Sequence, residues 1–426
     1  MIDTKTAIEK ITNGEFDNLF TDIYIDSSMI DYQKKRYVHA IEQYETIFCP
    51  DKVAIFSAPG RSEVCGNHTD HQHGMVLATS INLDTIAVSA KNNNDVVRFV
   101  SDGYDMITLD INDLEVNNDE AGTTVSLIRG VLRGLKDHGY KIGGFNAYAT
   151  SDVLVGAGLS SSAAFEVVVG TIISGLYNDM KINSVEIAQI SQYAENVFFK
   201  KPCGLMDQMA CSVGGMVNID FKDPTKPIVK KVPTEFEKYD YSLCIVDTKG
   251  DHVDLTDDYA MIPSEMKKVA NFLGEDYLRD CDSNEFYIRL DEIREAVGDR
   301  PVLRAIHFFN EEYNVKNAVS SLENGKFVEF LDAIRKSGNS SFKYLRNVYT
   351  TRDIQHQNIS VALALSESLL RNYGVCRVHG GGFAGTIQAF VKNDFVSNYK
   401  EFINKIFGEN SCHVLKVRKY GGIKVM

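Results

Sequence analysis

A loop rich in glycine and serine carries the strongest chemical signal in the sequence. Residues Gly156–Ala164 read GAGLSSSAA and lie between a β-rich run and a helical one. Glycines let the backbone approach a ligand closely, and the free N–H groups and positive dipole end of a following helix attract anions. No Gly-Lys-Ser/Thr ends the loop, so it is not a P-loop. We predict phosphate binding here; the alternative is a glycine turn that leads into a capped helix.

The net charge limits how such a phosphate can be held. The chain has 45 Lys+Arg and 58 Asp+Glu, a formal charge of −13. This balance argues against a broad nucleic-acid-binding surface. A single phosphate group must then be bound by backbone N–H groups and a few well-placed cations. The predicted phosphate-binding residues are Gly156, Gly158, Ser160, Ser161 and Ser162.

Three further motifs accompany this loop, in a fixed order along the chain. They are Ala58–Gly74 (APGRSEVCGNHTDHQHG), Pro202–Gln208 (PCGLMDQ) and Gly380–Gly385 (GGGFAG). With the serine loop they resemble the galactokinase family of GHMP small-molecule kinases, whose signature reads Gly-Arg-x-Asn-Leu-Ile-Gly-Glu-His-Thr-Asp-Tyr. The resemblance runs from about Lys52 to the C-terminus, and the first 50 residues lie outside it.

The resemblance implies a role for each matched residue. Asp207 corresponds to the catalytic carboxylate that faces the anomeric hydroxyl, as a base or as an orienting group. Arg61 corresponds to the arginine that keeps this carboxylate ionised and offsets charge on the moving phosphoryl group. Ser162 and Glu195 correspond to Mg²⁺ ligands, and hydroxyl and carboxylate oxygens suit this hard cation. The predicted sugar-binding residues are Asn67, His68, Asp70, Gly204 and Tyr259.

The sugar-binding segment departs from the family signature more than the phosphate loop does. Glu63, Val64 and Cys65 replace the signature's Asn, Leu and Ile, Asn67 replaces its Glu, and His71 replaces its Tyr. The family glutamate reaches the hydroxyl at carbon 6 of the sugar. An asparagine there removes a repulsion of about 1–4 kcal/mol against an anionic group about 4 Å away. The sequence thus predicts ATP-dependent phosphorylation of the anomeric hydroxyl of galactose or a related aldose. The alternative is a kinase for a sugar altered at carbon 6, such as galacturonate or arabinose.

Other functions fit these residues less well. A sensor that binds sugar and nucleotide without catalysis is disfavoured because Ser161–Ala164 and Asp207 are intact. A GHMP kinase for mevalonate or homoserine is disfavoured by His68–Asp70. The run His68–His73 contains residue types that bind zinc, but no further ligand cluster in the sequence completes a site.

The elements that must position these motifs are short strands and helices. β-rich runs between polar turns predict strands at Val53–Ser57, Thr85–Ala90, Val96–Val100, Met106–Ile111, Phe145–Thr150, Val375–His379, Thr386–Val391 and Cys412–Val417. Apolar residues at helical spacing predict helices at Gln33–Phe48, Val125–Leu135, Ser161–Tyr177, Ile359–Arg371 and Phe395–Phe407. This order favours an α+β class over a doubly wound sheet.

The length of 426 residues predicts two or three domains. We expect a helical extension over residues 1–50, an N-terminal GHMP kinase domain over 51–220 with the phosphate and sugar loops, and a C-terminal GHMP kinase domain over 221–426. The resemblance implies two lobes, each with mixed or antiparallel sheets and helices, and an active site between them.

The expected cofactors are ATP and Mg²⁺, and the expected partners are ATP and a small-molecule sugar. No nucleic-acid or membrane partner is expected, since the longest apolar stretch, near Val167–Tyr177, is far shorter than the roughly 20 residues of a membrane span. The N-terminus does not read as a signal peptide, and the eight cysteines are scattered, as reduced thiols are. We predict a cytoplasmic protein that is a monomer or a weak dimer.

Overall fold

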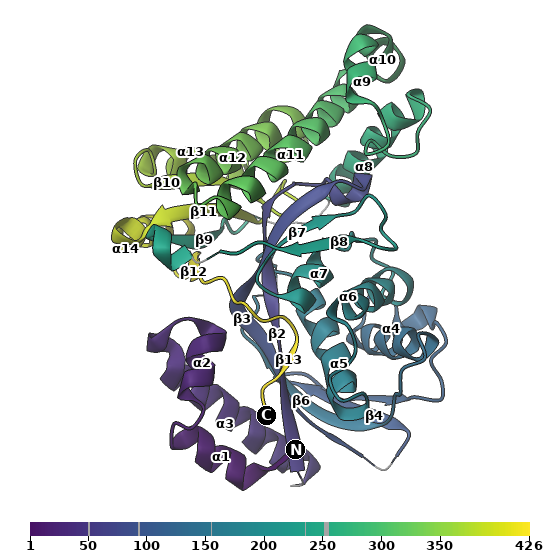
Figure 1. The fold of residues 1–426 in the computed structure, drawn as a ribbon, viewed down its shortest axis with the longest axis vertical. Helices are drawn as coiled ribbons and strands as arrows, with labels where there is room; N and C mark the ends of the chain where they lie inside the picture. The colour runs from purple at the N-terminus through teal and green to yellow at the C-terminus, as the bar shows by residue number, and fades with distance from the viewer. Residues whose placement is uncertain (50–51, 93, 155, 235, 251–254) are drawn as a thin grey trace.

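The computed structural model describes residues 1–49, 52–92, 94–154, 156–234, 236–250 and 255–426. Two β-sheets form the framework of the described part of the chain (Figure 1). The larger sheet follows the order β1 (Ile2–Asp3), β2 (Lys52–Cys65), β3 (Met75–Lys91), β6 (Phe145–Ser151), β4 (Val96–Ser101) and β5 (Ile107–Asp110). It also includes β13 (Ile423–Lys424) beside β2, β7 (Met216–Asp220) beside β3, and β8 (Ile228–Lys231) beside β7. The smaller sheet follows the order β10 (Gly374–His379), β11 (Thr386–Lys392), β9 (Tyr241–Asp247) and β12 (Cys412–Leu415).

Helices cover both faces of the larger sheet because its central strands are apolar on both sides. In β2, Ala54 and Phe56 pack into one core and Val53 and Ile55 into another, as the alternation of a strand requires. The first core holds α4 (Thr124–Asp137), α5 (Ser161–Tyr177) and α6 (Ser184–Tyr193), with Cys211 of α7 (Met206–Val213). The second holds α1 (Thr4–Thr12), α2 (Asp17–Tyr24) and α3 (Ile30–Phe48).

The smaller sheet is covered in the same way. Its residues pack on one face against α11 (Asp299–Glu323) and α12 (Phe327–Ser340), and on the other against α13 (Asn358–Leu369) and α14 (Val396–Phe407). A further core joins α8 (Thr256–Phe272), α9 (Ser283–Ile288) and α10 (Leu290–Val297) to the first half of α11. Of these helices, α9 and α10 lie at the top of Figure 1.

The N-terminal helices are anchored by one buried carboxylate. Asp84 of β3 has no exposed surface and accepts hydrogen bonds from Arg36 of α3 (2.6 Å), Tyr24 of α2 (2.9 Å) and Arg418 of the C-terminal segment (2.8 Å). The C-terminal end also returns to this region, since β1 and β13 pair with neighbouring stretches of β2. Asp84 therefore joins three parts of the chain that are distant in sequence.

The division into residues 1–50, 51–220 and 221–426 stays a prediction. Residues 50 and 51, where the first boundary falls, lie outside the described residues. Sheet pairing crosses both boundaries, because β1, β8 and β13 join the larger sheet.

Most predicted helices and strands are confirmed. The differences from the structure concern the residues at which these elements begin and end. The helix predicted at Ser161–Tyr177 has those bounds. The strand predicted at Val53–Ser57 ends too early: β2 continues to Cys65, with irregular register at Pro59/Arg61 and at Glu63/Cys65. Pro59 and Gly60 read as strand breakers in sequence, yet such irregularities accommodate them within a strand. The last strand ends at Leu415, and Val417 makes only an isolated bridge to Ile81. The fold class is α+β with mostly antiparallel pairs, β4 and β6 being parallel.

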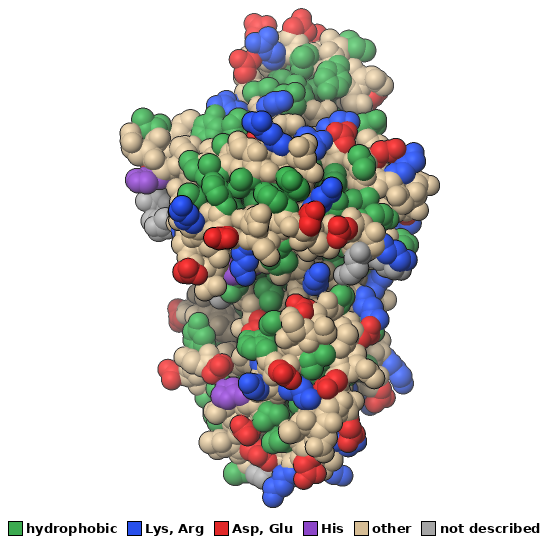
Figure 2. All heavy atoms as spheres, turned by 90° about the vertical axis from the view of Figure 1, so that its left-hand side faces the viewer, with side chains coloured by type: hydrophobic (Ala, Val, Ile, Leu, Met, Phe, Trp, Pro, Cys, Tyr) green, Lys and Arg blue, Asp and Glu red, His purple; other side chains and the backbone are tan. Residues whose placement is uncertain are grey.

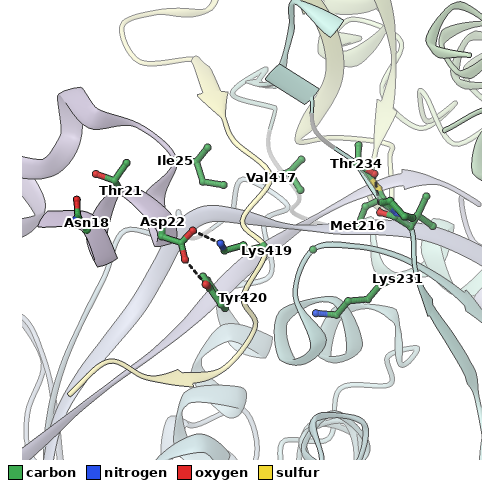
Figure 3. Close-up of a pocket in the computed structure, with 13 residues that line it drawn as sticks. Asn18, Thr21, Asp22, Ile25, Met216, Lys231, Thr234, Val417, Lys419 and Tyr420 are labelled. Atoms are coloured by element: carbon green, nitrogen blue, oxygen red, sulfur yellow. Dashed lines mark hydrogen bonds and ion pairs between the residues drawn. The ribbon is translucent and has the colours of Figure 1, made fainter. Parts of the chain in front are cut away.

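The surface and hollows of the molecule bear on possible partners. Figure 2 shows Lys and Arg interspersed with Asp and Glu on the face it presents. A pocket of about 790 Å³ lies between α2, the β7–β8 hairpin and the C-terminal segment (Figure 3). Asp22 bonds Lys419 and Tyr420 at its wall. Its lining includes no predicted site residue among those described. No helix in the described ranges has the length and apolarity needed to span a membrane.

Candidate active site

Asp207 lies in the first turn of α7, where three donors hold its carboxylate. Arg61 donates from Nε to Oδ1 (2.7 Å) and from Nη2 to Oδ2 (2.8 Å), and Ser160 Oγ donates to Oδ2 (2.5 Å). Burial opposes ionisation, but Arg61 and Ser160 hold the pKa of Asp207 below its usual range. About 30% of its side chain stays exposed. Asp207 is therefore an ionised, reachable carboxylate.

The serine loop reaches Asp207 because β2 packs directly against it. The backbone N–H of Arg61 donates to the Leu159 carbonyl (3.1 Å), and Arg61 Nη1 donates to the Gly158 carbonyl. A Cβ on Gly60 would lie 2.7 Å from the Leu159 oxygen, so this approach requires glycine. Gly158 and Ser160 have φ of +66° and +59°, and α5 begins at Ser161. The start of α5 thus lies beside the Asp207 carboxylate.

Two further carboxylates, those of Glu195 and Glu166, lie near the start of α5. Glu195 belongs to a π-helical turn, η4 (Ala194–Phe198), of the kind often found at functional sites. Ser162 Oγ donates to Glu195 Oε1 (3.2 Å), so the structure brings the two predicted metal ligands together. Gln208 Nε2 donates to Glu195 (2.7 Å) and to the fully buried Glu166 (3.2 Å). Burial and the charge of Glu195 raise the pKa of Glu166 well above its usual value.

The oxygen atoms of these side chains are suitable ligands for a magnesium ion. Hydroxyl and carboxylate oxygens are the ligands Mg²⁺ prefers, and Oε1 of Glu166 is buried without a hydrogen-bond partner. Over the described residues, His, Cys, Asp and Glu form no group of three or more placed to hold a metal ion, and the run His68–His73 gives no such group. The sequence missed Glu166 and Gln208. Glu166 follows Ser162 by four residues and therefore shares its helix face, which is the signal that could have found it.

The predicted sugar-binding residues contact two glycine segments, the one at Gly204 and the motif Gly380–Gly385. Asp70 lies so close to Gly204 that a Cβ there would be 1.9 Å from its Oδ2. Tyr259 of α8 donates its hydroxyl to the Gly382 carbonyl (2.7 Å). His68 Nε2 lies 3.0 Å from the Gly381 carbonyl and donates to it, and burial lowers the pKa of His68 to about 3. The glycine motif is therefore fastened to both predicted sugar-binding segments.

Asn67 has no exposed surface, and its amide is bonded entirely within the protein. Its Nδ2 donates to Glu63 Oε1 (3.1 Å) and to the Gly380 carbonyl (2.7 Å), while its Oδ1 accepts from Asn347 (2.8 Å). Glu63 in turn forms a buried ion pair with Arg377 (2.6 Å). The acid and amide of the family signature have exchanged places here, and the exchanged residues contact each other. The negative charge thus belongs to an internal ion pair, and contact of Asn67 with a sugar stays a prediction.

Two family models match the chain, and close relatives agree with them. The model for the galactokinase galactose-binding signature matches residues 42–91, and the model for the N-terminal domain of GHMP kinases matches residues 126–215. The galactokinase of Limosilactobacillus reuteri (strain DSM 20016) is 30% identical over 381 residues, 86% of this chain and 93% of that protein. The chain belongs to the galactokinase family. The galactokinase of Streptomyces coelicolor is 28% identical over 358 residues, 82% of this chain and 88% of that protein.

Solved structures support the same galactokinase-family fold. The superposition on the crystal structure of Lactococcus lactis galactokinase complexed with galactose covers 90% of this chain and 98% of the crystallised chain. Its TM-score is 0.76 at 23% sequence identity. A mevalonate kinase covers 85% of this chain and 99% of that one, with a TM-score of 0.55 at 17% identity. The α+β GHMP kinase fold predicted from the resemblance is confirmed.

Glu311 of α11 supports the signature segment of this galactokinase-family chain, and no sequence motif indicated this role. This fully buried carboxylate accepts the backbone N–H groups of Gly66 (3.0 Å) and Asn67 (3.3 Å) and the hydroxyl of Ser337 (2.7 Å). Burial opposes ionisation, but His307 and Arg377 hold the pKa of Glu311 below its usual range. Glu311 is a positioning residue, because it fixes the backbone that carries Asp70.

We expect Glu311→Gln to raise the KM for the sugar about tenfold while the KM for ATP changes less than twofold. The amide oxygen can serve the donors on Oε2, but its NH2 group then meets the Asn314 Nδ2 that donates to Oε1, and an unmade buried hydrogen bond costs about 1–3 kcal/mol. Steady-state kinetics with each substrate varied separately measures the split. Glu329→Gln, on the exposed side of α12, is the control. Equal rises in both KM values would contradict a local role.

Proposed function

We propose that this chain transfers the γ-phosphoryl group of ATP to the anomeric hydroxyl of galactose, or of a closely related aldose, to give the sugar 1-phosphate. The observation that carries the proposal is the Asp207 carboxylate, bonded by Arg61 and Ser160 beside the start of α5. That arrangement puts a proton acceptor next to an anion-binding helix terminus, which is what a hydroxyl attacking a phosphate requires.

The residues divide the work of this reaction. Asp207 orients the sugar hydroxyl and accepts its proton as the oxygen attacks phosphorus. Arg61 keeps Asp207 ionised and adds positive charge beside the site. The loop residues Gly156, Gly158, Ser160, Ser161 and Ser162 bind the nucleotide phosphates through the start of α5. His68, Asp70, Gly204 and Tyr259 form the sugar side, with Asn67 as part of its support.

Ser162 and Glu195 would hold Mg²⁺, with Glu166 and Gln208 behind them. When bound, this ion supplies positive charge to the phosphates of ATP. The hydrogen bond from Gln208 fixes the orientation of Glu195, and burial together with the charge of Glu195 raises the pKa of Glu166.

A coupled ADP-release assay with a sugar panel tests the proposal. We expect sugar-dependent ADP release with galactose, and formation of the 1-phosphate by phosphorus NMR. A protein that binds sugar and nucleotide but releases no ADP with any sugar would instead be a sensor.

The neutral Asn67 favours a second candidate substrate class, sugars altered at carbon 6. Its amide is already satisfied by the protein, so a pentose lacking carbon 6 leaves no unpaired group there. We expect kcat/KM for arabinose within about 100-fold of that for galactose, the range that a loss of 1–3 kcal/mol allows. Galacturonate is the third member of the panel, since the Glu63 carboxylate beside Asn67 is paired with Arg377. A preference for galactose above about 10,000-fold over both would rule this candidate out.

We further propose the division into a helical extension and two kinase lobes, with the site between the lobes. A cytoplasmic location and a monomeric or weakly dimeric state also stay predictions.

A further inference from the structure

The anion site of this acidic chain needs a cation that is free to meet phosphate, and Arg61 is not free. Its Nε and Nη2 are bonded to Asp207 and its Nη1 to the Gly158 carbonyl. Only 7% of its side chain is exposed. Three of its donor positions and its charge are therefore committed to Asp207 and the loop.

Lys201 supplies such a cation beside Glu195, which bonds Ser162 at the start of α5. Its Nζ lies 3.0 Å from Glu195 Oε1, the oxygen that also accepts from Ser162 at the start of α5. Its backbone N–H donates to the Glu195 carbonyl (3.1 Å), which fixes the base of the side chain. The Lys201 side chain is 60% exposed while that of Glu195 is 3% exposed, so Lys201 is the partner of this pair that a ligand from solvent can reach.

The surroundings keep this ammonium charged and near the reacting groups. Burial opposes protonation, but Glu195 and, more weakly, Asp207 raise the pKa of Lys201. Lys201 also helps to lower the pKa of Asp207, so the two charges act on each other. A lysine is a compact charge on a flexible stem, and it can exchange one anionic partner for another by rotation of its side chain.

We propose that Lys201 contacts the γ-phosphoryl group of the bound nucleotide, and that Glu195 holds its ammonium ready until the nucleotide arrives. This role rests on the proposed kinase function. On nucleotide binding the ammonium leaves Glu195 Oε1 for a phosphoryl oxygen, which also releases that carboxylate for a divalent cation. Lys201 then offsets the negative charge on the group that moves to the sugar.

The chain offers a matched control in the preceding residue. Lys200 is exposed, carries the same charge and is absent from the ion pairs seen among the described residues. Lys200→Met and Lys201→Met remove the same charge one residue apart. Lys201→Arg keeps the charge and tests whether a cation there is sufficient.

Nucleotide affinity is the first readout, because it needs neither sugar nor turnover. Calorimetry with ADP and with a non-hydrolysable ATP analogue, each with Mg²⁺, is run on all four proteins. We expect Lys201→Met to weaken binding of the ATP analogue about tenfold and binding of ADP less than twofold, since ADP lacks the γ-phosphate. Lys200→Met should change neither, and Lys201→Arg should recover at least half of the loss in binding free energy.

Turnover is the second readout. We expect kcat of Lys201→Met to fall about 30-fold or more, with the sugar KM within twofold of wild type. Equal effects at Lys200 and Lys201, an equal loss of ADP and ATP-analogue affinity, or unchanged affinity and kcat would each overturn the proposal. If the wild type binds the ATP analogue but turns over no sugar, the proposed function fails, while the affinities still decide the role of Lys201.

Discussion

Asp207→Asn is expected to lower kcat about 1,000-fold or more. Loss of a general base typically lowers the rate by about 10²–10⁴-fold, and loss of the negative charge adds to this effect. The amide cannot accept the proton of the sugar hydroxyl, and it offers Arg61 and Ser160 one acceptor oxygen where the carboxylate offers two. Nucleotide affinity should stay within about threefold, because the proposed role of Asp207 is toward the sugar hydroxyl and the substitution leaves the helix start at Ser161 in place. Stopped-time assays of ADP release and calorimetry with ADP measure the two effects.

Folding of this variant needs its own check, since Arg61 is left beside a neutral partner. A thermal melt and an unchanged ADP affinity show that the site has formed. Near-normal turnover in a folded Asp207→Asn protein would show that Asp207 is not the carboxylate that faces the attacking hydroxyl.

Asp84→Asn is expected to lower the free energy of unfolding by about 3–5 kcal/mol, the usual cost of removing one partner from a buried ion pair. Asp84 and Arg418 have no exposed side-chain surface, and Arg36 has 5%. Both guanidinium groups would face an uncharged amide, and the N-terminal helices would lose their main polar contact with β3. Urea denaturation followed by circular dichroism measures the change; the chain has no tryptophan for fluorescence.

The matched control is Glu15→Gln, in an exposed ion pair with Lys10. Exposed pairs contribute about 0–1 kcal/mol, so this variant should behave as wild type. If Asp84→Asn were as stable as Glu15→Gln, the buried network would not anchor the N-terminal helices.

The same network predicts a pH dependence of definite sign. Burial opposes the ionisation of Asp84, but Arg36 and Arg418 hold its pKa below the usual value. A carboxyl whose pKa is lowered by folding contributes its full stabilisation above the unfolded value of about 3.9. That contribution is lost as the pH falls through the folded pKa. The stability gap between wild type and Asp84→Asn should therefore be constant near pH 7 and shrink below about pH 4.

Local sequence determined the elements whose signals are local. The apolar run after three serines fixes α5 at Ser161–Tyr177, because a helix start and a helical core face are both encoded within it. The course of β2 past Pro59 was not predictable in this way. Its register is set by pairing with β3 and by contact with the serine loop, neither of which a single segment encodes.

The sequence by itself determined the family, the serine loop and the identity of Asp207 and Arg61 as candidates, since each lies in a motif whose residue types and order are specific. Only the tertiary structure decided which groups meet. It joined Arg61 to Asp207 across 146 positions, bonded Asn67 within the protein, and set Glu311, Glu166 and Lys201 beside the predicted site. The physical reason is that the charge, the burial and the available hydrogen-bond donors and acceptors of a side chain depend on neighbours that folding brings close. A sequence motif contains only neighbours along the chain.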